Sequence, residues 1–275
     1  MKKLLALVVA VALPLFVHAE GTESLAPKLQ NVSVTVHSED GQGSGTIVTR
    51  SGTNFVLTAG HVVAANRVIT KLLVDGNVKM EVSFIPVTVV KEIYADGRSV
   101  GSLTVEGEVI AYSSSEYGDD VALLKLRSKV TDASAEFYTG ELVQPGTPIV
   151  HVGSLLGQEG SNSFTTGEMS QIGRVLFDKV FDQVNCVAYP GSSGGGLFLK
   201  QDGRYIGMLV RGAGPGLELI VPVRRIQKWA KEHTCEFVLN PKAAVGAVKL
   251  ETKEPIGDTP VSEDGENKFP FLLAR

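Results

Sequence analysis

Short apolar runs, separated by clusters of turn residues, dominate the sequence between Asn31 and Val221. Several runs alternate polar and apolar residues, with Gly, Asn, Asp or Ser between them, which is typical of half-buried β-strands joined by turns. The predicted strands cover residues 32–37, 46–49, 55–57, 121–126, 148–152, 205–210 and 218–221. Long helical periodicity is absent here, so the pattern predicts an all-β fold built as barrels or a sandwich.

The stretch between Val74 and Asp119 is too long for a tight connection. It contains strand-like runs at residues 82–90 and 103–111. We interpret these runs as extended hairpins that belong to the first half of the β-structure.

A single helical pattern follows the last predicted strand. Pro222 suits the first turn of a helix, because the amide hydrogen that proline lacks has no partner there. Residues 223–233 then place Ile226, Trp229 and Ala230 on one face and most basic residues elsewhere. We therefore expect an amphipathic helix that docks on the β-structure.

Residues 1–19 have the layout of a secretory signal peptide. Lys2 and Lys3 precede an apolar run at residues 4–17, and a cleavage site follows at Ala19. A buried helix or a membrane anchor is the alternative, but this run is shorter than the roughly 18 residues that span a bilayer. No later stretch is long and apolar enough, so we expect a secreted or periplasmic protein without a stable membrane span after signal removal.

The C-terminal part differs in composition. Residues 240–268 are rich in Pro, Glu, Asp and Lys and lack apolar periodicity, so we expect a flexible tail over residues 237–275. The apolar residues 269–273 near the end are either a frayed end or a segment that docks on this protein or a partner.

Charge and cysteine content limit the possible functions. The 275-residue chain has a net charge of −4, which gives no reason to expect nucleic-acid binding, because that usually requires basic patches. Cys186 and Cys235 are its two cysteines. They form either a disulfide or two separate buried thiols, and the sequence leaves both alternatives open. Without a paired histidine motif, no zinc or other metal site is predicted.

Three short motifs occur in a fixed order along the chain. They are Leu-Thr-Ala-Gly-His-Val-Val at residues 57–63, Asp-Asp-Val-Ala-Leu-Leu-Lys-Leu at 119–126 and Pro-Gly-Ser-Ser-Gly-Gly-Gly at 190–196. Together they resemble the His, Asp and Ser segments of the chymotrypsin/trypsin-like serine peptidase family, and the resemblance covers residues 30–235. Each motif is weak or moderate by itself, whereas their order is specific.

The resemblance implies two antiparallel six-stranded β-barrels of the chymotrypsin type, with a C-terminal helix and an active site between the barrels. It divides the chain into an N-terminal barrel at residues 20–135 and a C-terminal barrel plus helix at residues 136–236. It also implies a serine endopeptidase that cuts proteins or peptides through an acyl-enzyme intermediate, without a metal or organic cofactor; the signal-like residues 1–19 add the expectation of secretion.

Chemistry assigns a role to each residue of the predicted triad. A serine hydroxyl is a poor nucleophile at neutral pH and needs a base, so we expect Ser193 to attack and His61 to accept its proton. Asp120 directly precedes an apolar strand, as in the family, and would hold the imidazole in one tautomer. Ser192 stands one place too early, and Asp119 is expected to be a solvated or turn residue.

The resemblance also places the backbone amides of Gly191 and Ser193 in an oxyanion hole. The chain departs from digestive trypsins at Ser192, where they carry an Asp that pairs with a new N-terminus. It also lacks an Ile-Val-Gly-Gly start. It is closer to bacterial members such as the periplasmic heat-shock proteases. About 40 residues follow the predicted helix, so we expect that these do not form the PDZ domain of those proteases, and we expect activity without propeptide removal.

The substrate pocket is the least determined part of the prediction. Val187 stands where trypsins carry an Asp at the pocket floor, and Val210, Arg211 and Gly212 are expected in the facing wall. An uncharged floor favours a small or medium apolar residue before the cut and disfavours Lys or Arg. Arg211 either points to solvent or favours an acidic side chain.

Two other functions are compatible with the sequence. A catalytically silent, protease-like binding protein fits the same fold, although all three polar residues of the triad are present. An esterase fits the same triad. An α/β-hydrolase is disfavoured, because its acid and histidine follow the serine, whereas here they precede it.

Overall fold

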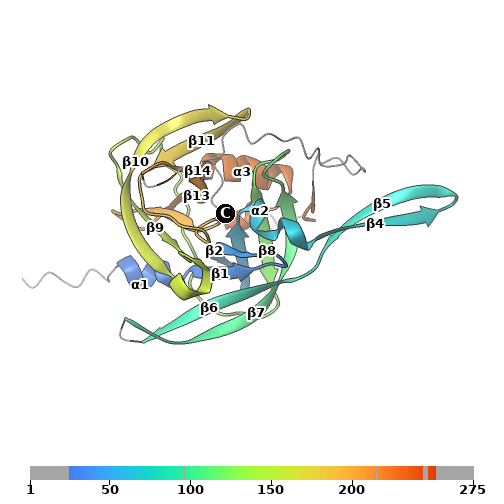
Figure 1. Cartoon of the computed structure of the whole chain (residues 1–275), viewed down its shortest axis with the longest axis horizontal. Helices are drawn as coiled ribbons and strands as arrows, with labels where there is room; N and C mark the ends of the chain where they lie inside the picture. The colour runs from blue at the N-terminus through green and yellow to red at the C-terminus, as the bar shows by residue number, and fades with distance from the viewer. Residues whose placement is uncertain (1–24, 96, 213, 215, 244–246, 252–275) are drawn as a thin grey trace, which may run out of the picture.

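A computed structural model describes residues 25–95, 97–212, 214, 216–243 and 247–251 of the chain. This part contains two closed six-stranded antiparallel barrels (Figure 1), which confirms the predicted fold class. A separate two-stranded sheet and four short helices accompany the barrels in these residues. The predicted signal peptide and the apolar residues 269–273 lie outside the described residues.

The first barrel contains the strands that precede and follow the His and Asp motifs. Its strands are joined in the order β1 (Ser33–His37), β2 (Gln42–Arg50), β3 (Thr53–Thr58), β8 (Val121–Leu126), β7 (Arg98–Ser113) and β6 (Val87–Ala95). The turn between β2 and β3 consists of Ser51 and Gly52, with φ of 48° and 78°, a two-residue turn that matches the twist of the strands. Val34, Val56 and Leu124 are among its fully buried core residues.

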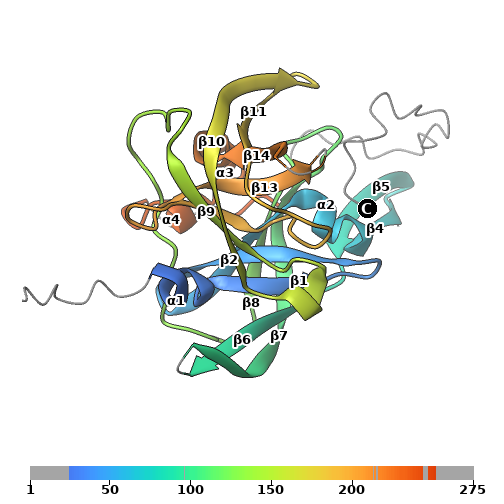
Figure 2. The ribbon, with the colours of Figure 1, turned by 60° about the vertical axis from the view of Figure 1, so that its left-hand side comes forward.

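The second barrel contains the strands around the Ser motif. Its order is β10 (Ser163–Leu176), β11 (Lys179–Val184), β14 (Glu218–Pro222), β13 (Tyr205–Gly212), β12 (Gly196–Leu199) and β9 (Pro148–Gly153). Phe198 and Tyr205 fill part of its interior, with ring centroids 5.6 Å apart in an edge-on contact. The connection between the barrels runs over residues 127–147 and includes the predicted boundary at 135–136. Figure 2 shows the second barrel above the first.

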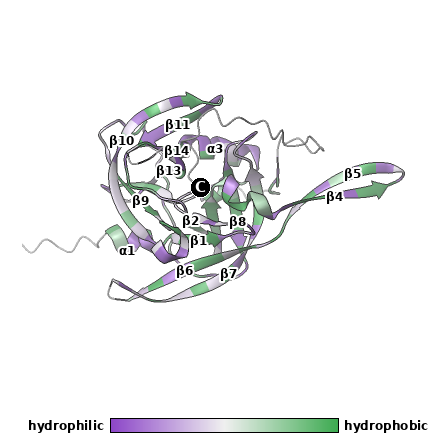
Figure 3. Cartoon of the chain, viewed as in Figure 1, coloured by the Kyte–Doolittle hydropathy of each residue, from purple (hydrophilic) through white to green (hydrophobic). Residues whose placement is uncertain are grey.

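One hairpin stands apart from both barrels. Strands β4 (Arg67–Val74) and β5 (Asn77–Phe84) form a sheet of their own, which projects from the molecule (Figure 1). Hydrophilic and hydrophobic residues alternate along this hairpin (Figure 3). The prediction that residues 74–119 form hairpins of the first barrel is therefore right for β6 and β7 and wrong for β5. Alternation of polar and apolar residues predicts a strand, but it does not reveal which other strand pairs with it.

Four short helices are α1 (Leu25–Gln30), α2 (Gly60–Val63), α3 (Val223–Glu232) and α4 (Glu236–Leu239). The predicted amphipathic helix is α3. Pro222 is its N-cap residue, and the buried Ile226, Trp229 and Ala230 pack into the core. None of the helices in the described residues is long and apolar enough to cross a membrane.

Part of the predicted flexible tail is ordered and docked. Helix α4 begins the region, and residues 247–251 lie against the first barrel. The Tyr112 amide donates a 2.7 Å hydrogen bond to the Leu250 carbonyl, and the Arg67 guanidinium binds the Glu251 carboxylate through two hydrogen bonds. Composition does not predict this docking, because it depends on partners in β7 and β4. The rest of the tail lies outside the described residues.

The two cysteines do not form a disulfide. Cys186 and Cys235 are both free and buried, and they lie in two different apolar clusters. Burial raises the pKa of each thiol to about 12, so both act as small apolar side chains. The disulfide alternative is therefore wrong, and the alternative of two separate thiols is correct.

Candidate active site

His61 lies where β3 leaves the first barrel and the chain turns into α2. The turn passes very close to β7, since a β-carbon at Gly60 would lie 2.2 Å from the Ser113 carbonyl oxygen. Only glycine fits this approach. The contact fixes the start of α2 and so positions His61, whose side chain is 35% exposed.

Asp120 lies directly before β8 on the same barrel. Its φ is +58°, a conformation that Asp adopts more readily than most residues. The buried carboxylate accepts a 2.9 Å hydrogen bond from the His61 amide and a 3.0 Å hydrogen bond from His61 Nδ1. Because an ionised carboxylate only accepts, Nδ1 carries the proton and Nε2 is left as an acceptor. Asp120 therefore fixes both the backbone and the imidazole of His61.

Asp119 is not the solvated turn residue that the sequence suggests. Its carboxylate accepts a 2.8 Å hydrogen bond from Arg225 Nε, and its carbonyl accepts a 2.6 Å hydrogen bond from Arg225 Nη2. Its amide donates to the Ser113 hydroxyl at 2.6 Å. Helix α3, which follows the second barrel, thereby holds the loop of the first barrel that presents Asp120.

Ser193 lies in the loop that joins β11 and β12 of the second barrel. Strand β2 of the first barrel holds this loop, because the Ser44 amide donates to the Ser193 carbonyl and the Ser44 hydroxyl donates to the Gly191 carbonyl, both at 2.7 Å. A β-carbon at Gly194 would lie 2.1 Å from the Ser44 carbonyl oxygen, and φ there is +86°. Glycine after the serine therefore allows the two barrels to approach at this point.

Two backbone amides beside the predicted nucleophile are unpaired. Among the described residues, the amides of Gly191 and Ser193 donate no hydrogen bond. Ser192 between them is fully buried. Its amide donates to the Tyr189 carbonyl at 2.9 Å, and its hydroxyl accepts from the Tyr189 amide at 3.1 Å. Ser192 therefore closes the turn, and its hydroxyl is not available as a nucleophile.

A cavity of about 580 Å³ joins the two halves of the predicted triad. His61 from the first barrel lines it together with Gly191 and Ser193 from the second. In the described part of the chain, the imidazole is hydrogen-bonded to Asp120 and not to the Ser193 hydroxyl. Catalytic hydrogen bonds are often long in free enzymes and tighten when substrate binds. The cavity is therefore lined by a base, a hydroxyl and backbone amides, which are the groups that acyl transfer needs.

The charges of the pair keep the acid ionised and the base strong. Burial raises the pKa of Asp120, but the charge and hydrogen bonds of His61 outweigh burial and bring that pKa below its ordinary value. Burial lowers the pKa of His61, and the charge and hydrogen bond of Asp120 outweigh this effect and raise that pKa. The charge of Arg211 lowers both. An ionised acid beside an imidazole of raised basicity suits a general base.

The residues predicted for the substrate pocket lie in different surroundings. Val210 is buried in the apolar core, and Val187 is 47% exposed. The Arg211 guanidinium lies 5.4 Å from the centroid of the Phe177 ring and donates to the Ser115 carbonyl at 3.5 Å. Arg211 therefore does not extend freely into solvent, and it faces the loop that carries Asp120.

Sequence reasoning missed Glu218, an acid beside the predicted pocket. It begins β14 and pairs with Gly212, the last residue of β13. Glu218 is 3% exposed, and its carboxylate has no hydrogen-bond or ion-pair partner among the described residues. The signal in the sequence was a single acid at the start of an otherwise apolar strand, which does not indicate where the side chain points.

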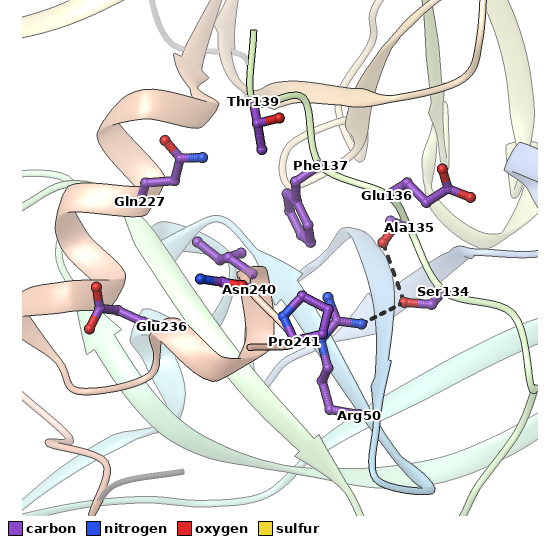
Figure 4. Close-up of a pocket in the computed structure, with 11 residues that line it drawn as sticks. Arg50, Ser134, Ala135, Glu136, Phe137, Thr139, Gln227, Glu236, Asn240 and Pro241 are labelled. Carbon is purple, nitrogen blue, oxygen red and sulfur yellow. Dashed lines mark hydrogen bonds between the residues drawn. The ribbon is translucent and has the colours of Figure 1, made fainter. Parts of the chain in front are cut away.

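Figure 4 shows a second cavity, which has a volume of about 660 Å³ and is not lined by any residue of the predicted triad. It opens between the connection of the two barrels, the end of β2 and helix α4, where Arg50 donates to the Ser134 hydroxyl at 3.2 Å. It shares no lining residue with the first cavity. The described residues contain no cluster of three or more His, Cys, Asp or Glu side chains that would hold a metal ion.

Known proteins resemble this chain over most of its length. A family model described as a trypsin-like peptidase domain matches residues 43–208. The chain is 24% identical over 194 residues to the serine protease Do-like HtrA of Lactobacillus helveticus. The aligned region covers 68% of this chain and 39% of that protein. It is 28% identical over 224 residues to the putative protease Do-like 14 of Arabidopsis thaliana, covering 76% of this chain and 46% of that protein. The chain thus spans less than half the length of these relatives.

Solved structures share the fold at low sequence identity. The serine endoprotease from Yersinia pestis matches with a TM-score of 0.55 and 18% identity, over 78% of this chain and 65% of that one. Deg5 matches with a TM-score of 0.55 and 20% identity, over 80% of this chain and 94% of that one. The family model, which covers more than half of the chain, and the two barrels lead to one conclusion. The chain belongs to the family of trypsin-like peptidase domains, and it is similar to Do-like HtrA proteases.

Proposed function

We propose that this protein is a secreted serine endopeptidase that cuts peptide bonds with Ser193, His61 and Asp120. One observation supports the proposal most strongly. His61, held by a buried carboxylate, and Ser193, next to two unpaired backbone amides, line the same cavity although they come from different barrels.

The chemistry proceeds in two halves. In the first half, His61 Nε2 accepts the proton of the Ser193 hydroxyl as the oxygen attacks the peptide carbonyl carbon. The oxyanion that forms accepts hydrogen bonds from the amides of Gly191 and Ser193. The imidazolium then donates its proton to the leaving amine, and the acyl-enzyme remains. In the second half, His61 takes a proton from water as the water oxygen attacks the ester carbonyl carbon. The bond to Ser193 then breaks, and the imidazolium returns that proton to the Ser193 oxygen, so the acid product and the free enzyme are released.

Asp120 keeps the imidazole productive in both halves. Its pKa lies below the ordinary value, so it stays ionised over the neutral range and holds the Nδ1 proton. This fixes Nε2 as the atom that exchanges protons with Ser193, the amine and water. The two hydrogen bonds to the amide and ring of His61 also limit rotation of the side chain.

The chain is also proposed to be active without removal of a propeptide. Digestive trypsins order this loop by an ion pair between an Asp and a new N-terminus, as the resemblance implies. Here the Ser192 side chain and amide both bond to Tyr189, which supports a loop that is ordered by local contacts. Secretion rests on the signal-like residues 1–19 and belongs to the proposal.

A fluorophosphonate probe tests the proposed nucleophile, because it reacts with an activated serine. Ser38 is the matched control, since it is the other serine that lines the cavity. We expect the probe to label the wild type and Ser38→Ala, and to leave Ser193→Ala unlabelled, as measured by intact-protein mass spectrometry. An unlabelled but folded wild type would favour the silent binding protein. A labelled protein that cleaves simple esters and no peptide would favour the esterase.

A further inference from the structure

We infer that Glu218 makes this cleft select a lysine or arginine residue directly before the cleaved peptide bond. The inference rests on the proposed function, because it assigns a substrate class to the same site. It replaces the expectation of a small or medium apolar residue, which considered only the uncharged Val187 and not an acid from another strand.

The backbone path from Ser193 to Glu218 is short enough for a long substrate side chain. Beside the nucleophile, the Gly194 amide donates to the Leu209 carbonyl at 2.8 Å. From Leu209, β13 continues for three residues to Gly212, which is about 10 Å at the usual rise of a strand. Gly212 is paired with Glu218. A substrate carbonyl held at Ser193 would therefore place a four-carbon lysine stem or an arginine stem within reach of this carboxylate.

The other chain segment that leads to Ser193 also passes Glu218. Val184, at the end of β11, pairs with Glu218 across the sheet. Two residues later, the charge of Glu218 acts on the Cys186 thiol and raises its pKa further. Val187 follows directly. The carboxylate thus lies between the two backbone segments that the sequence analysis assigned to the floor and the wall of the pocket.

Gly212 leaves the space that the carboxylate occupies. A β-carbon at Gly212 would lie 2.1 Å from Glu218 Oε2 and 2.9 Å from Cδ, so a larger residue would displace the acid. Gly212 itself is partly exposed. The carboxylate is therefore buried against a segment that borders solvent, and the inference requires that a substrate side chain reaches it past Gly212.

Glu218 has no charged or hydrogen-bonding partner in the part of the chain that the structure describes. Among the described residues, no group pairs with its carboxylate, and burial alone raises its pKa to about 7. The nearby cations are committed elsewhere: Arg211 lies against Phe177, and Arg224 binds Asp182 at 2.6 Å. A buried acid without a partner is costly and rare, and a cation supplied by the substrate would satisfy it.

The chemistry of the surroundings favours a basic side chain over a free metal ion. A single carboxylate offers too few oxygen ligands for calcium or magnesium. A carboxylate binds a guanidinium through a bidentate pair of hydrogen bonds, or an ammonium as a point charge. The apolar Cys186 and Val187 next to it suit the methylene stem of such a side chain.

A matched series of peptides tests the inference. The peptides differ only in the residue before the cut, which is Arg, Lys, Leu or Glu, and kcat/KM is measured for the wild type, Glu218→Gln and Glu141→Gln. Glu141 is the control, because it is an exposed acid in the connection before the second barrel. We expect the wild type and the control to prefer Arg and Lys. We expect Glu218→Gln to lose about 100-fold on those two peptides and nothing on the Leu peptide.

Two further measurements keep the inference falsifiable. Labelling of Ser193 by the fluorophosphonate probe shows separately whether the nucleophile works in each variant. If Glu218→Gln does not fold, the wild type alone is tested with benzamidine, whose cation should inhibit competitively, and with uncharged benzamide, which should inhibit far more weakly. A labelled wild type that prefers the Leu peptide, or that binds both compounds equally, would overturn the inference and leave the proposed function intact.

Discussion

The two buried acids of the cleft, Asp120 on the first barrel and Glu218 on the second, have similar burial and opposite surroundings. They are 2% and 3% exposed. Asp120 accepts hydrogen bonds from the backbone and the ring of His61, whereas Glu218 has no partner among the described residues. The pKa of Asp120 accordingly lies below its ordinary value, and that of Glu218 rises to about 7. Burial raises the pKa of both acids, and the presence or absence of a partner decides the sign of the net shift.

Asp120 is therefore stabilised within the folded protein, whereas Glu218 is left to bind a cation from the substrate. Because the pKa of Glu218 is raised, the native state keeps this proton to a higher pH than the unfolded chain does. Ionisation of Glu218 therefore lowers the free energy of unfolding as the pH rises from about 4.5 to above 7. At pH 8 this cost is roughly 3 kcal/mol. Asp120 has the opposite linkage, because its stabilisation is present above the ordinary pKa and is lost as pH falls through the lowered one.

The largest expected effect comes from removing the charge of the satisfied acid. Asp120→Asn should lower kcat by about 10⁴-fold, because the amide no longer enforces the tautomer of His61 that leaves Nε2 free. Asp119→Asn is the control, since Asp119 bonds to Arg225 rather than to the imidazole. We expect it to change stability more than kcat. Steady-state kinetics with one peptide substrate measures both. Equal losses in the two variants would contradict the assignment of Asp120.

A smaller effect concerns the pH dependence of substrate choice. The ratio of kcat/KM for an Arg peptide to that for a Leu peptide should fall by about tenfold per pH unit below 7, because Glu218 becomes neutral. The titration of His61 affects both peptides and cancels in the ratio. The other ionisable groups on adjacent segments are Arg211, Asp182 in its ion pair with Arg224, and the Cys186 thiol with a pKa of about 12.

The same pH series identifies the group responsible. In Glu218→Gln the ratio should be flat between pH 6 and pH 8, since an amide does not titrate. The variant should also unfold at a higher temperature than the wild type at pH 8, because the cost of the buried charge is removed. A ratio that still falls in this variant would assign the pH dependence to another residue.

Local patterns in the sequence predicted the two barrels, and they pointed to a candidate site whose residue roles stay predictions. The strand runs indicated barrels, and the residues around His61, Asp120 and Ser193 are specific because each has a tight local constraint. The glycines at positions 60 and 194 illustrate this, since each allows a backbone approach that no larger residue permits. Constraints of this kind leave a readable trace in a single chain.

The parts that escaped prediction depend on contacts between distant segments. Asp119 looked like a turn residue because its partner, Arg225, is 106 positions away. The docked segment at residues 247–251 has no periodicity of its own and is held by β4 and β7. Glu218 looked like an ordinary strand end, and only the pairing of β14 with β11 and β13 places it between Val187 and Gly212. Side-chain direction at such positions is a property of the assembled fold.

Digestion of a reduced, unfolded protein by the wild type, with all cut sites mapped by mass spectrometry and Ser193→Ala as the blank, tests both proposals at once. We expect new ends that follow lysine and arginine residues and that are absent from the blank. Cuts after apolar residues with no enrichment of lysine or arginine would contradict the role of Glu218. Cuts that persist in the blank would contradict the assignment of Ser193 itself.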